Sequence, residues 1–164
     1  MAGLIEDDVL VSALSMRIQE AGRLDQWLRR RDGWYGDAFR RQAEADESRE
    51  VDWELQRYFH FSVLWVLDVF ELARTIDVAG GLPLTPPARA ALKSLRKHLA
   101  SIRAPLAKFQ RAGERDSFMA WPVLVYGSGA GWNVGGDEPE IVSRQRLGDE
   151  FLEFLEAAVG GTAT

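Results

Sequence analysis

The chain has 164 residues, a hydrophobic fraction of 46% and a net charge of −5, which supplies enough apolar material for one domain with its own core. It contains no cysteine, so disulfides and thiolate-bound metals are excluded, and we expect a reducing, cytoplasmic location. The acidic balance excludes a general polyanion binder, and the acidic N-terminus MAGLIEDDVL lacks the positive charge of a secretory signal.

The first predicted helix runs from about Asp7 to Arg30. Its apolar residues recur at steps of three and four, which gives one apolar stripe: Leu10, Leu14, Ile18, Ala21, Leu24 and Leu28. Asp32 and Gly33 predict the end of this helix. The polar stretch 37–48 predicts one or two further helical turns.

The second predicted helix covers about 49–78 and ends at the glycines 80 and 81. Its centre, FSVLWVLDVF (61–70), is the most apolar run of the chain and contains Asp68. A membrane span needs roughly 20 apolar residues. The run therefore predicts a buried helix and no membrane contact.

The third predicted helix starts with Thr85 as its cap and Pro86 in the first turn, and it ends near Ala112. Its apolar residues form a surface for packing against other helices: Leu92, Leu95, Leu99, Ile102, Leu106 and Phe109. Pro105 lies inside it and predicts a kink or an interruption near Ser101.

The pattern changes after residue 118. The segments FMAWPVLVY, WNV and EIV are short, apolar and separated by glycines, which predicts a unit of two or three strands. A last helix begins at Ser143, and residues 160–164 form a predicted disordered tail. The expected fold is mainly α: a single domain (1–159) built as a four-helix bundle with a small β-hairpin insertion between helices three and four.

The sequence indicates no metal site, cofactor or catalytic residue, because neither histidine has the Glu-x-x-His spacing of a metal-binding bundle and no cysteine is present. One alternative is a small-ligand binder or enzyme with a pocket between the second helix and the aromatic hairpin, lined by His60, Trp65, Asp68, Trp121 and Trp132. In the simpler interpretation, His60 donates a hydrogen bond to a backbone or carboxylate group. Asp68 then forms an ion pair with Arg74 or with an arginine of another helix.

The third helix is basic in an acidic protein. Eight Lys or Arg and one Glu lie between residues 86 and 115, and five of the cations fall within one arc of the helix: Arg89, Lys93, Arg96, Arg103 and Arg111. Such a stripe binds nucleic-acid phosphates. Alternatively, it pairs with acids of the same protein, within one subunit or between two subunits, either in the acidic stretch 37–54 or in the last helix.

The segment SLRKHLASIRAPLAKF (94–109), followed by a Trp- and Gly-containing hairpin and by IVSRQRL (141–147), resembles the third helix and later elements of the HEPN superfamily. These are four-helix bundles found in bacterial toxin–antitoxin and antiphage systems. The resemblance implies metal-free RNA cleavage by an Arg and a His separated by four to six residues. In this chain Arg103 is followed at those places by Lys108, Phe109 and Gln110, so the resemblance implies a catalytically disabled member.

We therefore predict a bacterial, cytoplasmic and non-catalytic interaction or accessory module of a HEPN-like kind. We expect a homodimer formed through the Leu- and Phe-rich helical faces, with a protein or a nucleic acid as a further partner. The nucleic-acid binder and the small-ligand binder remain the alternatives.

Overall fold

A computed structural model describes residues 2–45, 53–79, 84–108, 121–125, 127–135 and 140–160. These residues form the helices α1 (Ala2–Ala45), α2 (Trp53–Ala79), α3 (Pro86–Lys108) and α4 (Arg144–Gly160). Between α3 and α4 lie the strands β1 (Trp121–Val125), β2 (Gly129–Asn133) and β3 (Ile141–Ser143). The predicted mainly α fold with a small sheet between the third and fourth helices is confirmed.

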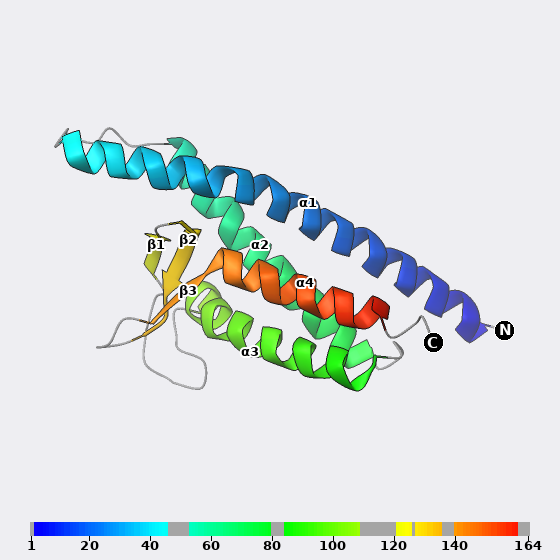
Figure 1. Cartoon of the computed structure of the whole chain (residues 1–164). Helices are drawn as coiled ribbons and strands as arrows, with labels where there is room; N and C mark the ends of the chain where they lie inside the picture. Colours follow the sequence, from blue (N-terminus) through cyan, green and yellow to red (C-terminus); the bar gives the residue numbers. More distant parts are fainter. Residues whose placement is uncertain are drawn as a thin grey trace.

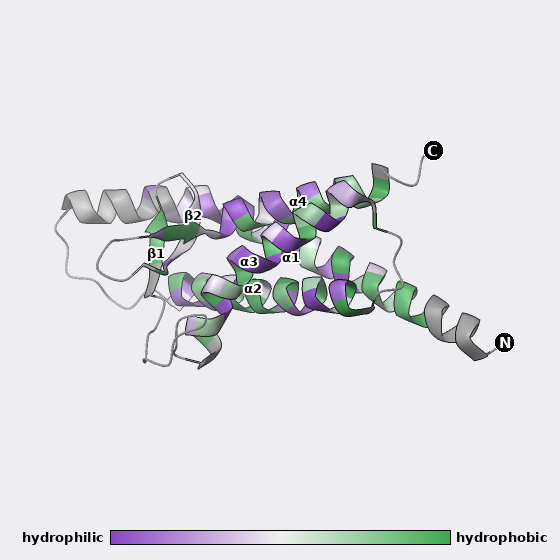
Figure 2. Ribbon diagram, turned by 90° about the horizontal axis from the view of Figure 1, so that it is seen from below, coloured by the Kyte–Doolittle hydropathy of each residue, from purple (hydrophilic) through white to green (hydrophobic). Residues whose placement is uncertain are grey.

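The helices pack as neighbours, with α1 against α2, α2 against α3 and α3 against α4 (Figure 1). The long α1 extends past the other helices at its N-terminal end (Figure 1). Figure 2 shows hydrophilic and hydrophobic residues alternating along the helices, as amphipathic packing requires. The five largest fully buried side chains of the described residues lie in this interior: Trp65, Trp132, Arg144, Tyr58 and Phe154.

The sheet is antiparallel with the strand order β1-β2-β3. Gly127 and Gly129 adopt positive φ angles of 73° and 69° at the turn between β1 and β2, a backbone conformation that side chains with a Cβ disfavour. The central strand β2 contacts both α1 and α4, and its Ala130 and Trp132 are fully buried. The sheet is thus fixed against the helices through β2.

The predicted end of the first helix at Asp32 and Gly33 is wrong, because α1 continues to Ala45. Gly33 is exposed, and a Cβ at its position would meet no atom within 4 Å. Asp32 is buried and its carboxylate is bonded to residues of α2 and α4. The tertiary bonds of Asp32 therefore outweigh the weak helix propensity of the Asp-Gly pair.

The predicted interruption at Pro105 is not seen either, since α3 continues to Lys108. Pro105 and Ile102 are buried, so packing holds this last turn although proline cannot donate to the carbonyl of Ser101. The start of the last helix is confirmed: Ser143 is its cap, and its Oγ accepts from the backbone amide of Arg146 at 3.2 Å. The predicted tail beyond Gly160 lies outside the described residues.

Candidate functional site

The basic residues of α3 border a groove of about 500 Å³ between α2 and α3. Its lining combines four cations with one acid and two apolar side chains: Arg89, Lys93, Arg96, Lys97, Asp77, Phe70 and Ala100. The cations recur at helical spacing, so they share one side of α3. The groove therefore presents a positive surface in a chain whose net charge is negative.

Acids of α2 hold two cations of the stripe. Arg96 forms an ion pair with Asp77. Arg103 lies 3.4 Å from the Glu71 carboxylate, and its guanidinium carbon is 4.9 Å from the centre of the Phe70 ring. The alternative of internal charge pairing is thus correct for these two residues, but their partners come from α2 and not from stretch 37–54 or the last helix.

The remaining predicted cations behave differently. Arg89 and Lys93, together with Lys97 on the same groove, are exposed and make no ion pair with any described residue. Arg111 lies outside the described residues. Three positive charges on the groove therefore remain available to an external anion.

The five residues of the predicted small-ligand pocket occupy separate environments. His60 is exposed, whereas Trp65 and Trp132 are fully buried. Asp68 pairs with Arg17 of α1, which confirms the predicted ion pair with another helix. Trp121 lies in β1, and its side chain is outside the description.

No hydrogen bond, ion pair or ring contact joins any two of the four described members of this pocket, and none of them lines the groove between α2 and α3. Trp65 donates to the Ala21 carbonyl at 3.0 Å, a contact between helices. The small-ligand pocket stays a prediction that these contacts do not support.

The strongest polar cluster was not predicted from the sequence. Arg144, at the start of α4, has no exposed side-chain surface and forms ion pairs with Asp25 and Asp32 of α1. The Tyr58 hydroxyl of α2 donates to Asp32 and accepts from the Ala130 amide of β2 at 2.6 Å. We call these residues, with Arg29, the Arg144 network.

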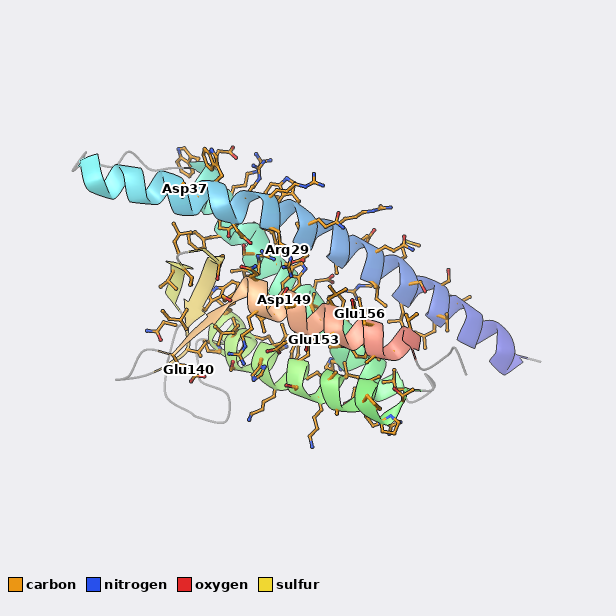
Figure 3. The ribbon with its side chains drawn as sticks, in the orientation of Figure 1. Arg29, Asp37, Glu140, Asp149, Glu153 and Glu156 are labelled. Atoms are coloured by element: carbon orange, nitrogen blue, oxygen red, sulfur yellow. The ribbon has the colours of Figure 1, made fainter. Side chains whose placement is uncertain are left out.

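Arg29 extends this network to the surface. It donates to Asp25 at 2.6 Å and to Asp149 of α4 at 2.8 Å, and Arg29 and Asp149 lie next to each other between the two helices (Figure 3). The network therefore connects α1 with α4 at two residues, Arg144 and Asp149, which lie in the first two turns of α4.

Burial is the largest influence on the pKa of two members of this network, Asp32 and Tyr58. It raises the pKa of Asp32 above its usual range, although the Tyr58 hydrogen bond and the Arg144 charge act in the opposite direction. Burial, and then the hydrogen bond to Asp32, also raise the pKa of the Tyr58 hydroxyl. The backbone of Gly129 packs directly against the cluster, so that a Cβ at this position would collide with both Asp32 and Tyr58. A cluster sealed in this way holds elements together and has no room for a substrate.

No group of three or more His, Asp or Glu side chains in the described part of the chain is arranged to hold a metal ion. Within the same residues, no helix is long and apolar enough to cross a membrane. No family model, curated protein or solved structure matches the chain. The HEPN resemblance therefore stays a prediction, and the groove between α2 and α3 is the candidate site.

Proposed function

We propose that the protein is a non-catalytic accessory module of a HEPN-like kind that binds the phosphate backbone of a nucleic acid in the groove between α2 and α3. The observation that supports this most is the free cation set, Arg89, Lys93 and Lys97, next to an acid-paired Arg96. The acid-paired Arg96 forms part of the groove wall, and the free cations supply charge for phosphates.

The environment of Arg103 supports a binding role without catalysis. In the HEPN-like pattern this arginine would steady the phosphate under attack, but here Glu71 and the Phe70 ring occupy it. No histidine follows it at the required spacing. Lys108 is a poor base at neutral pH, since the reference pKa of lysine is about 10.4.

The test is binding of a fluorescent oligonucleotide at about 50 and about 200 mM salt. Lys93→Gln should weaken binding severalfold at low salt and reduce the slope of log K against log salt by about 1. The matched control is Arg146→Gln on α4, which removes the same charge from a side chain already paired with Glu150 at 3.1 Å.

The control should bind like the unmodified protein within about twofold, because Arg146 lies on α4 and does not line the groove. Absence of binding at low salt, or an equal loss in both variants, would contradict the proposal. RNA cleavage in the presence of a chelator would contradict its non-catalytic part.

The Leu- and Phe-rich helical faces, which we expected to form a dimer, pack inside the bundle. We therefore propose a homodimer formed through the N-terminal part of α1 instead. Val9 and Met16 are 65% and 59% exposed there, and because they stand seven residues apart they lie on one face of α1. Exposed apolar groups on one face of a helix are suited to pairing with the same face of a second copy. Light scattering should give twice the monomer mass for the unmodified protein and the monomer mass for Met16→Glu. The control variant Val78→Glu changes an exposed valine of α2 and should stay dimeric.

A further inference from the structure

A second groove lies between the C-terminal half of α1 and the start of α2. It consists of two adjoining hollows of about 400 and 430 Å³ that share Trp27, Arg31 and Glu54. Each hollow falls within the range of roughly 300–1,000 Å³ that ligand sites span. We call this the aromatic–arginine groove.

Helical spacing builds both walls of this groove. On α1, Trp27, Arg31 and Trp34 follow one another at steps of four and three, and Arg30 lies beside them. On α2, Arg57 and Phe61 also stand four residues apart. Residues at these steps share one face of a helix, so the sequence places an aromatic and cationic stripe on each wall.

Aromatic rings hold the arginines of the groove in place. The guanidinium carbon of Arg31 lies 4.2 Å from the centre of the Trp27 ring, and that of Arg57 lies 5.9 Å from the centre of the Phe61 ring. Trp27 and Phe61 meet edge to face, with ring centres 5.4 Å apart. These contacts fix the rings and the guanidinium groups before any ligand arrives, which lowers the entropy cost of binding.

The polar groups of the groove are not all used inside the protein. Arg30 and Arg31 make no ion pair or hydrogen bond with a described residue, and the buried Nε of Arg31 has no partner. Arg57 lies 3.6 Å from the Glu54 carboxylate. Among the described residues that line the groove, three arginines stand against one glutamate, which gives this lining a positive charge, and Trp34 is 55% exposed beside it.

We infer that the aromatic–arginine groove binds single-stranded nucleic acid by stacking an unpaired base on Trp34 while Arg30, Arg31 and Arg57 contact the phosphates. Exposed indole rings accept any base, since every base has a π-face, and arginine adds stacking and charge. A duplex keeps its bases stacked internally and cannot use these rings. The aromatic–arginine groove is a different surface from the groove between α2 and α3. It would add base contacts to the phosphate contacts of the proposed function.

The test compares a labelled single strand of about 12 nucleotides, the duplex of the same sequence and an abasic strand of the same length. Trp34→Ala should weaken binding of the single strand roughly fivefold or more, as loss of one stacked base does. It should leave binding of the duplex and the abasic strand unchanged. The matched control is Trp53→Ala, because Trp53 is 74% exposed but lines neither hollow.

A second variant tests the phosphate contacts. Arg30→Gln should weaken binding of both the normal and the abasic single strand, and circular dichroism should show an unchanged fold because Arg30 is exposed. Equal affinities for Trp34→Ala and Trp53→Ala would overturn the inference. So would Trp34-dependent binding of an acidic, tyrosine-containing peptide without binding of the oligonucleotide.

The two proposals fail in distinguishable ways. If Lys93→Gln weakens binding and Trp34→Ala does not, the aromatic–arginine groove is wrong and the groove between α2 and α3 stands. If Trp34→Ala weakens binding of the single strand and Lys93→Gln changes nothing, the groove between α2 and α3 is wrong and the aromatic–arginine groove stands.

Discussion

Replacing Arg144 by methionine tests the Arg144 network directly. The side chain of Arg144 is 0% exposed, and those of its partners Asp32 and Asp25 are 7% and 15% exposed. Removing one member of a buried ion pair costs about 3–5 kcal/mol because it leaves an uncompensated charge. We expect about 3 kcal/mol, since Asp25 keeps Arg29 and Asp32 keeps the Tyr58 hydroxyl.

The assay is urea unfolding followed by circular dichroism. With a slope of about 2 kcal/mol per M, the midpoint should fall by about 1.5 M. The matched control is Arg146→Met, two residues further along α4, whose side chain is 56% exposed. It should lose about 0.2–1 kcal/mol.

A double variant separates charge from packing. Arg144→Met combined with Asp32→Asn should recover part of the lost stability, because no unpaired charge is then buried next to Tyr58. If Arg144→Met and Arg146→Met cost the same, or if the double variant is less stable than Arg144→Met, the assignment of the network as the main polar link between α1 and α4 is wrong.

Gly129→Ala should lower the free energy of unfolding by more than Gly127→Ala, because both glycines have positive φ but only the alanine at 129 would collide with its neighbours; equal losses in thermal unfolding would contradict this. The pKa of Asp32 is higher in the folded than in the unfolded state, so ionisation of Asp32 lowers the stability of the fold. The stability of the unmodified protein relative to Asp32→Asn should therefore fall as the pH rises from the unfolded pKa through the folded pKa. A flat difference between the two pH profiles would refute that sign. Thr85→Ala should cost about 0.5–2 kcal/mol through loss of the cap on the Ala88 amide, and Thr85→Ser should restore most of it in the same unfolding assay.

Periodicity predicted the helices well because their packing faces repeat at regular steps. The apolar stripe around Leu28 and the start of the last helix at Ser143 depend on local sequence, and the structure confirms both. The end predicted at Asp32 failed for a different reason. Local propensity contains no information about Arg144, which lies 112 residues later and bonds to that carboxylate.

In the candidate sites, too, features set within one helix were predictable and contacts between helices were not. The basic stripe of α3 was predictable, because it depends on spacing within one helix. Which of its cations stay free was not predictable, because Asp77 and Glu71 come from another helix. A usable signal for the Arg144 network was present in Asp25 and Asp32, two acids seven residues apart on the face of the apolar stripe.

The Arg144 network also bears on the order in which the chain folds during synthesis. Asp25 and Asp32 leave the ribosome 119 and 112 residues before Arg144, a delay of about 5–25 s at typical rates of translation. Throughout that interval Asp25 can pair with Arg29, but the Asp32 carboxylate on the inner face of α1 lacks the cation that it pairs with in the folded protein. The pair formed by α1 and α2 therefore cannot bury Asp32 as one half of an ion pair. Arrival of α4 is therefore the step that completes this core, and nascent chains that stop before residue 144 should remain sensitive to protease.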